Sequence, residues 1–178
     1  MNKETALLVI DVQVGIIDGP TPAYQGSEVL KRIDSLLSRA RASGVPVIYV
    51  QDDDVGGGVG ADGWRIHPAI APANGERVVH KLACDAFYET TLKSELEAGD
   101  IKHLVVVGCK TQNCIDTTCR TATATGYNVT LVGDAHTTTA NGTLTAAQII
   151  AHHNETLDDF GNDKHVIRVK ASDEITFE

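Results

Sequence analysis

Two strand-length runs of apolar residues constrain the fold of this chain more than any other feature. Residues 5–12 read Thr-Ala-Leu-Leu-Val-Ile-Asp-Val, and residues 101–108 read Ile-Lys-His-Leu-Val-Val-Val-Gly. A strand that is apolar along most of its length, rather than at alternate positions, is typically buried on both faces. The sequence therefore predicts a sheet in which these strands are covered by other elements on either side.

Helical patterns separate the predicted strands. Between residues 28 and 43 apolar residues recur at helical spacing, and Gly44 stands where a C-terminal cap belongs. Further strands are predicted at 45–51, 77–81, 127–134 and 165–170, and further helices at 89–98, 113–125 and 144–157. Strands that alternate with helices pair in parallel through crossover connections. The expected fold class is α/β, a three-layer sandwich with a six-stranded, mainly parallel, Rossmann-like sheet.

Length and charge narrow the possible classes of protein. With 178 residues the chain can bury one substantial core, so a single domain over residues 1–178 is expected. A net charge of -9, without a cluster of Lys and Arg, argues against nucleic-acid binding. The sequence does not open on a signal-peptide pattern, and no apolar run reaches the length that crosses a membrane. We therefore expect a cytoplasmic protein with free thiols at Cys84, Cys109, Cys114 and Cys119.

Three chemically reactive residues stand at or just after the ends of predicted strands: Asp11, Lys81 and Cys114. In open parallel sheets, ligands bind beyond the carboxyl ends of the strands, near the point where the strand order reverses, so these residues can converge. Cys114 follows a polar elbow and lies in the first turn of a predicted helix, where the helix N-terminus stabilises a thiolate. A neighbouring ammonium and a carboxylate acceptor would complete a nucleophilic site.

Each of these residues also has a plain structural interpretation. An acid near the end of a buried strand can be a hydrogen-bonded carboxylate, a single lysine is usually solvated, and a cysteine is often an inert core residue. The polar neighbours of Cys114 favour an exposed elbow over the core. For Cys109 and Cys119 we expect packing in the core, because Cys119 lies five positions along the same helix and projects in another direction.

The segment 52–72 is rich in Gly and Asp and shows no sustained period, which predicts a long surface loop. Gln13, Trp64, His67 and Phe87 are candidates for the lining of a substrate pocket. Gln13 is also placed to orient Asp11, and Trp64 is equally suited to anchoring the loop.

These motifs together resemble the isochorismatase-like cysteine hydrolases, a superfamily that includes nicotinamidases, N-carbamoylsarcosine amidases and streptothricin hydrolases. The resemblance runs through residues 8–13, Lys81 with Phe87 after it, the elbow at 107–118 and the segment 126–135. Residues 63–68 and 144–154 are most similar to the streptothricin-hydrolase-type branch.

The resemblance implies a cysteine-dependent amidohydrolase that cleaves a C–N bond, other than a peptide bond, of a small molecule. Asp11 would accept the proton of Cys114, Lys81 would hold the thiolate and the carboxylate in place, and Cys114 would attack the carbonyl to form a thioester. A cis peptide between Cys109 and Lys110 is also implied, with an oxyanion hole formed by the backbone N–H groups of Lys110 and Cys114. The expected partners are a small-molecule amide substrate and further copies of the chain in a dimer or tetramer, but no nucleic acid or membrane.

The sequence lacks a metal-binding element that part of the family carries. Nicotinamidases share an Asp-x-His element after the second strand that, with a later His, binds a metal, whereas residues 51–54 read Gln-Asp-Asp-Asp here. We therefore expect no metal and no other cofactor, with Asp52 and His67 the pair that could still hold an ion. His152 and His153 point to different helix faces, which disfavours joint chelation and favours a subunit contact or a capped helix end.

Alternatives to the cysteine hydrolase stay open at this point. One is a metal-assisted, nicotinamidase-like amidase. Another is a redox-sensing thiol protein that pairs Cys114 with Cys109 or Cys119 and forms no acyl intermediate. The third is a noncatalytic ligand-binding or scaffolding domain, which is disfavoured because all three reactive residue types are present.

Overall fold

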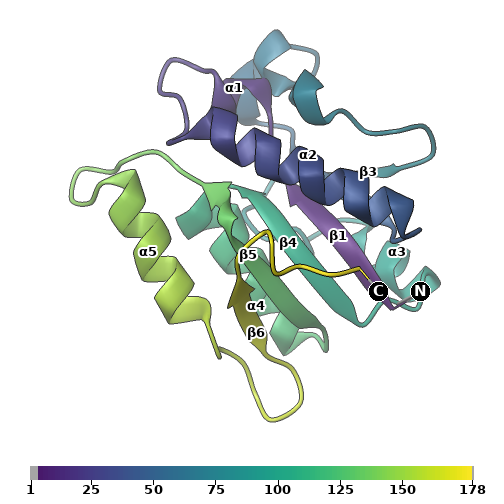
Figure 1. The fold of residues 1–178 in the computed structure, drawn as a ribbon. Helices are drawn as coiled ribbons and strands as arrows, with labels where there is room; N and C mark the ends of the chain where they lie inside the picture. The colour runs from purple at the N-terminus through teal and green to yellow at the C-terminus, as the bar shows by residue number, and fades with distance from the viewer. Residues whose placement is uncertain (1–3, 178) are drawn as a thin grey trace.

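The centre of the molecule is a six-stranded parallel sheet, seen in a computed structural model that describes residues 4–177 (Figure 1). The strands are β1 (Thr5–Ile10), β2 (Val47–Asp52), β3 (Arg77–Lys81), β4 (His103–Cys109), β5 (Asn128–Thr137) and β6 (Ile167–Lys170). They pair in the order β3-β2-β1-β4-β5-β6, and every pair is parallel. The predicted α/β class is confirmed, and the sheet is parallel throughout rather than mainly so.

Helices connect the strands much as the apolar spacing predicts. They are α1 (Val14–Ile17), α2 (Gly26–Ala42), α3 (Leu92–Ala98), α4 (Asp116–Ala124) and α5 (Ala146–Leu157). The segment predicted as a loop contains three short 3-10 turns, η1 (Val55–Gly57), η2 (Asp62–Trp64) and η3 (Pro68–Ile70). These turns and α1 are too short to show a period in sequence, which is why they were not predicted. No helix within residues 4–177 is both long and apolar enough to cross a bilayer.

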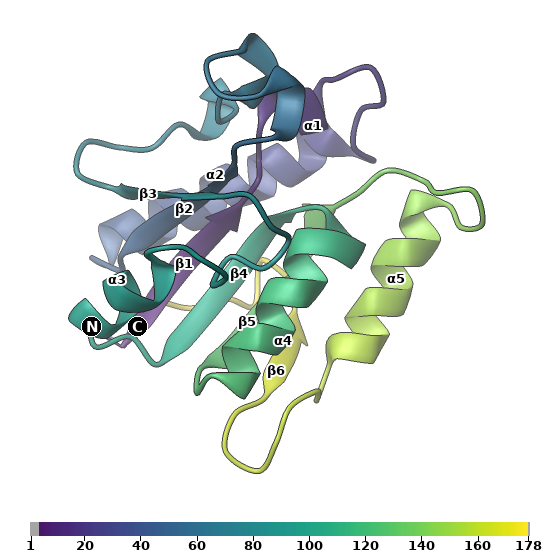
Figure 2. The same cartoon turned by 180° about the vertical axis from the view of Figure 1, so that it is seen from behind.

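The helices cover both faces of the sheet, as the doubly buried strands require. Helix α2 lies across the face seen in Figure 1, and α3 and α4 lie on the opposite face, seen in Figure 2. Leu7 and Val9 of β1 pack in the α2 core with Ile33, whereas Leu8 and Ile10 pack in the core of the other face. Helix α5 packs beside β5 and β6. The predicted three-layer arrangement is confirmed.

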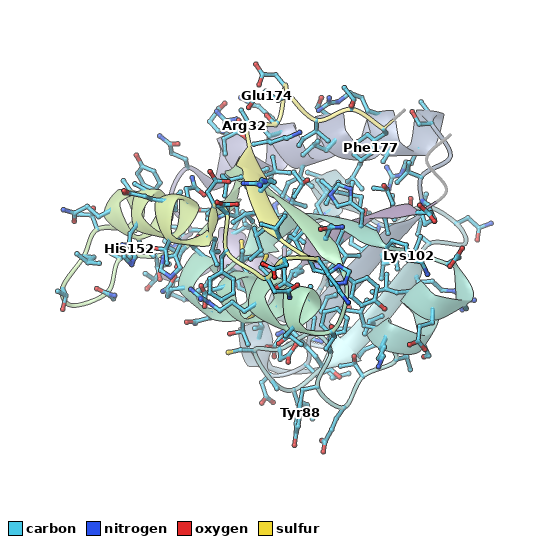
Figure 3. All side chains as sticks on the ribbon, turned by 90° about the horizontal axis from the view of Figure 1, so that it is seen from below. Arg32, Tyr88, Lys102, His152, Glu174 and Phe177 are labelled. Atoms are coloured by element: carbon cyan, nitrogen blue, oxygen red, sulfur yellow. The ribbon has the colours of Figure 1, made fainter. Side chains whose placement is uncertain are left out.

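The C-terminal segment continues the α2 layer. It runs back across the α2 face of the sheet, and the guanidinium of Arg39 donates hydrogen bonds to the backbone carbonyls of Ser172 and Ile175. Phe177 is 5% exposed in the same core as Ile33, and Figure 3 shows it beside α2. The end of the described chain therefore closes the core at the edge remote from the strand C-termini.

Strand β5 is longer than its apolar pattern predicts. It continues to Thr137, because Gly108 and Cys109 of β4 pair with His136 and Thr137 after a register shift between Val106 and Gly108. Gly108 itself has a φ of 125°, and a Cβ there would lie 2.0 Å from the backbone oxygen of Ile10. A glycine is required at this close approach of β4 to β1. The approach brings the elbow that follows β4 next to Asp11.

Candidate active site

Four side chains meet at the carboxyl edge of the sheet, where the strand order reverses. Asp11 directly follows β1, Asp52 ends β2, Lys81 ends β3, and Cys114 lies in a π-helical turn, η4 (Thr111–Ile115), after β4. Chain order runs outward from β1 through β2 to β3 on one side and through β4 to β6 on the other. The switch point of an open parallel sheet, between β1 and β4, is where such folds bind ligands.

The Lys81 ammonium is the centre of this cluster. Its Nζ lies 2.9 Å from Asp11 Oδ2, 2.7 Å from Asp52 Oδ2 and 3.3 Å from Cys114 Sγ. Lys81 is 3% exposed, Asp11 1% and Cys114 8%. An isolated charge at this depth would be costly, and the contacts supply the partners that make it tolerable. The acid, the ammonium and the thiol that the sequence singles out therefore lie together.

Burial and mutual charge decide how the cluster titrates. Burial raises the pKa of Asp11 to about 6, although the Lys81 charge opposes the rise. Burial would lower the pKa of Lys81, but Asp11, Cys114 and Asp52 outweigh it and raise that pKa above its usual value. Apart from the Lys81 ion pair, the oxygens of Asp11 receive no well-aligned hydrogen bond from the described residues. Asp11 can therefore accept a proton beside a permanently charged ammonium.

The thiol of Cys114 departs from the sequence prediction in one respect. Its place at the start of a helical segment predicts a thiolate stabilised by the helix dipole. In the structure, burial first and the Asp11 charge second raise the pKa of Cys114, and Lys81 offsets them in part. Desolvation outweighs the dipole and the ammonium here. Burial therefore favours the protonated thiol, and the Asp11 carboxylate, which has an oxygen within 4.8 Å of the sulfur, is placed to accept its proton.

A buried hydrogen-bond chain holds the elbow that carries Cys114. The Cys109–Lys110 peptide is cis, as the family resemblance implies. Thr111 Oγ1 lies 2.8 Å from His136 Nδ1, and His136 Nε2 lies 2.7 Å from Asn154 Oδ1. Asn154 Nδ2 donates to the backbone oxygen of Gly133, so its Oδ1 accepts from His136 Nε2–H, which leaves Nδ1 to accept from the Thr111 hydroxyl. The chain ties the elbow to β5 and α5.

Sequence reasoning missed His136. It is 1% exposed, and burial lowers its pKa to about 4, so the ring is neutral above that pH. The residue lies two positions beyond the predicted end of its strand, in a polar stretch with no period. A histidine next to a run of threonines gives no sign in sequence of which residue it bonds.

The four side chains predicted to line a substrate pocket each make a specific contact within the protein. Gln13 is fully buried and clamps two backbones, donating to the Asp52 and Trp64 carbonyl oxygens and accepting from the Asp52 N–H, so it does not orient Asp11. The Trp64 indole donates to Asp53 Oδ1 and stacks on His80, so it anchors the loop.

The other two predicted lining residues are likewise committed. His67 Nε2 lies 3.0 Å from Asp18 Oδ2 and its Nδ1 accepts from the Ala69 N–H, while the Phe87 ring stacks on Tyr127 at 5.8 Å. A cavity of about 260 Å³ beside the cluster is lined instead by Asp53, His80, Lys81, Leu82, Ala83, Tyr88 and Glu89. Tyr88 is 59% exposed and projects from the body of the molecule (Figure 3). None of the four predicted residues lines this cavity.

Potential metal ligands in the cluster are already bound to the ammonium. Within residues 4–177 the one group of three such ligands is Asp11, Asp52 and Cys114, whose ligand atoms lie within 4.8 Å of one another. The Lys81 Nζ contacts all three, so a cation there would have to displace it. His67, which the sequence pairs with Asp52, contacts Asp18 instead.

The remaining cysteines and the paired histidines lie outside the cluster. Cys109 and Cys119 are fully buried, as predicted, and burial raises the pKa of both thiols; Cys84 is exposed, and all four cysteines are free. His153 Nδ1 bonds the Ile149 carbonyl, and its ring meets that of His152 edge-on at 5.2 Å between centroids.

The chain is similar to known proteins over most of its length. A streptothricin hydrolase of Streptomyces noursei is 38% identical over 136 residues, covering 75% of this chain and 49% of the relative, so the chain spans about half the length of that protein. A ureidoacrylate amidohydrolase of Caulobacter segnis is 30% identical over 172 residues, with 75% of this chain and 72% of the relative covered.

Solved structures and family models extend the comparison to the rest of the chain. The structure of N-carbamoylsarcosine amidase from Thermoplasma acidophilum superposes with a TM-score of 0.80 at 26% identity, covering 97% of this chain and 98% of the other. The model of the Isochorismatase domain matches residues 5–154. With a conserved-domain match over most of its length and a relative of 38% identity, the chain belongs to the isochorismatase family.

Proposed function

We propose that this protein is a cysteine-dependent amidohydrolase that cleaves a C–N bond of a small molecule through a thioester intermediate. The observation that carries the proposal is the contact of one buried ammonium with both a thiol and a carboxylate, at 3.3 and 2.9 Å. That arrangement combines a nucleophile, a proton acceptor and a fixed positive charge. The named amidohydrolases among the relatives support cleavage of a C–N bond.

The proposed reaction moves one proton back and forth between sulfur and oxygen. Asp11 takes the proton of the Cys114 thiol as the sulfur attacks the amide carbonyl carbon, and Lys81 holds the developing thiolate. When the C–N bond breaks, Asp11 returns the proton to the leaving nitrogen, and a neutral thioester remains on Cys114. Water then attacks the thioester while Asp11 takes its proton, and the sulfur leaves as thiolate and is reprotonated by Asp11.

The backbone N–H groups of Lys110 and Cys114 are proposed to bind the carbonyl oxygen as it becomes negative. Both belong to the elbow that the Thr111–His136–Asn154 chain holds against β5 and α5. Donors fixed in advance stabilise an oxyanion without reorganisation, and the loss of one typically slows the reaction by a hundredfold or more.

Two alternatives, a metal-assisted amidase and a redox-sensing thiol protein, receive less support. A metal-assisted amidase would need an ion where the Lys81 ammonium lies, or a site built on residues other than those that contact it. A redox pair with Cys109 or Cys119 would use thiols whose burial raises their pKa. Thiolate character is what makes a redox-sensing cysteine reactive.

The experiment is ammonia or amine release across a panel of small amides, ureides and lactams by the unaltered protein and two variants. We expect Cys114→Ala to abolish release while its circular dichroism spectrum stays unchanged, because the nucleophile is gone and the fold is not. Cys84→Ala, which removes an exposed thiol outside the cluster, should keep full activity. Hydrolysis by Cys114→Ala at the unaltered rate would refute the proposed nucleophile.

A further inference from the structure

Asp52 makes the shortest contact with the catalytic ammonium, although the proposed reaction assigns it no step. It is the last residue of β2 and stands directly opposite Lys81, the last residue of β3. Its Oδ2 accepts a hydrogen bond from Lys81 Nζ at 2.7 Å, compared with 2.9 Å for Asp11 and 3.3 Å for Cys114. The Asp52 side chain is 16% exposed, so water screens this pair weakly.

The backbone of Asp52 is held without help from its carboxylate. The Gln13 side-chain amide donates to the Asp52 carbonyl at 2.9 Å and accepts from the Asp52 N–H at 3.0 Å. The second carboxylate oxygen accepts from the Asp54 N–H, a contact that an Asn side chain can also make. Replacement of Asp52 by Asn removes the negative charge and leaves the Gln13 contacts to the backbone in place, but an amide has a single acceptor oxygen and keeps only one of the two side-chain contacts.

The charge on the other two partners of Lys81 changes during the proposed reaction. Asp11 is neutral whenever it carries the proton, and Cys114 is neutral both as a thiol and as a thioester. A buried ammonium that loses its only counter-ion is strongly destabilised. The proposed reaction gives Asp52 no proton to carry, so its negative charge can balance the ammonium at every stage.

We propose that Asp52 is a positioning residue, the constant counter-ion that holds the Lys81 ammonium while negative charge moves between Cys114 and Asp11. This inference rests on the proposed thiol mechanism and adds a fourth member to its cluster. It assigns the last position of the second strand to the support of an ammonium.

The proposal requires the charge of Asp52 to change how its neighbours titrate. One of its carboxylate oxygens lies within 4.8 Å of an oxygen of Asp11 and of the Cys114 sulfur. A negative charge at that distance makes both groups harder to ionise, and the Asp52 charge is among the causes that raise the pKa of Asp11. For an effective dielectric constant between 80 and 20, Coulomb's law gives a shift between roughly 0.5 and 2.5 pH units.

The groups that face Asp11 and Cys114 from the surrounding elements set the rest of the local field. They are Asp52 at the end of β2, Lys81 at the end of β3, and Cys109 at the end of β4, which is itself influenced by the charge of Lys110. Substitution of Asp52 changes one of these and leaves the others in place.

The test compares Asp52→Asn with Asp54→Asn, both in a Cys84→Ser background so that the exposed thiol does not react. Asp54 is exposed and two positions away, so its substitution removes the same charge outside the cluster. Alkylation of Cys114 by iodoacetamide is followed from pH 6 to pH 10 by mass spectrometry of the Cys114 peptide, and the acid limb of kcat/KM is measured on the best amide substrate.

We expect Asp52→Asn to move the alkylation profile and the acid limb to lower pH by at least about half a unit, which is about threefold faster alkylation at a fixed pH on the rising limb. Asp54→Asn should leave both in place. Identical profiles for the two variants, or a shift of either profile to higher pH in Asp52→Asn, would overturn the proposal. Alkylation requires no turnover, so it tests the Asp52 proposal independently of amidase activity. Amide hydrolysis by Cys114→Ala would refute the proposed function, whereas the alkylation profiles would still report the effect of the Asp52 charge.

Discussion

Replacement of Lys81 by Met tests whether the ammonium holds the cluster together. The substitution keeps an unbranched side chain in the core and leaves Asp11 and Asp52 with carboxylate oxygens within 4.8 Å of each other and no positive charge between them. At an effective dielectric constant of about 20, two like charges at that distance repel by about 3.5 kcal/mol. Removal of one partner from a buried ion pair typically costs about 3–5 kcal/mol. We expect Lys81→Met to lower the free energy of unfolding by about that amount at pH 8.

The pH dependence of this loss has a definite sign. Without the ammonium, the folded-state pKa of Asp11 rises further above its unfolded value, and a group with a raised folded pKa contributes stability that is lost as pH rises through that pKa. The stability lost at pH 8 should therefore be partly regained at pH 5, where Asp11 is protonated.

Urea unfolding at the two pH values measures both effects, provided that the dependence on urea concentration is the same for all variants. Addition of Asp52→Asn to Lys81→Met should restore about 2–3 kcal/mol at pH 8, because it removes the repulsion that the first substitution exposes. A loss below about 1 kcal/mol in Lys81→Met, or no recovery in the double variant, would refute the account of the cluster.

Three further outcomes are expected. Because burial raises the pKa of Asp11 to about 6 and the reaction needs its ionised form, kcat/KM should fall about tenfold for each pH unit below 6. A kcat/KM profile that begins to fall only near pH 4 would count against Asp11 as the proton acceptor. Gly108→Ala should destabilise the protein by at least about 3 kcal/mol in thermal or urea unfolding, since its Cβ would lie 2.0 Å from the Ile10 oxygen. Gly142→Ala, with open space around it, should not destabilise the protein, and equal stability of the two variants would contradict that packing. Dialysis against a chelator should leave amidase activity unaltered, because the ammonium lies among the available ligands; a loss that zinc restores would reverse that expectation.

The catalytic candidates could be found in the sequence because parallel sheets bring strand ends together. Asp11, Lys81 and Cys114 each follow an apolar run, and the carboxyl ends of such runs meet at one edge. Their chemistry is local to each residue, so the pattern was sufficient to select them. The family resemblance added their roles and the cis peptide at Cys109–Lys110, which the structure contains.

Asp52 could not be selected in the same way. It is one of three consecutive acids, and which of them faces Lys81 depends on the register between β2 and β3. A shift of one residue would turn a different carboxylate toward the ammonium. The strand register is a property of the folded sheet and is not written in a single stretch of sequence.

The contacts of the predicted pocket residues could not be read from the sequence for a related reason. Trp64, His67 and Phe87 were chosen because large or titratable side chains in loops often line binding sites. Each contacts a residue that the fold brings next to it. The Trp64 indole, for instance, donates a hydrogen bond to the Asp53 carboxylate and stacks on the His80 ring. Gln13 bonds the Trp64 carbonyl 51 positions away, a contact that no local pattern could indicate.

The most direct test of the central claim is a search for the covalent intermediate. Unaltered protein is mixed with an amide substrate, quenched in acid within the first turnovers and analysed by intact mass, with the adduct located by peptide mapping. We predict a mass increase equal to the acyl portion of the substrate, carried by the Cys114 peptide and absent from Cys114→Ala. Sustained hydrolysis with no acyl group on Cys114 at any quench time, or an adduct on another residue, would contradict the account.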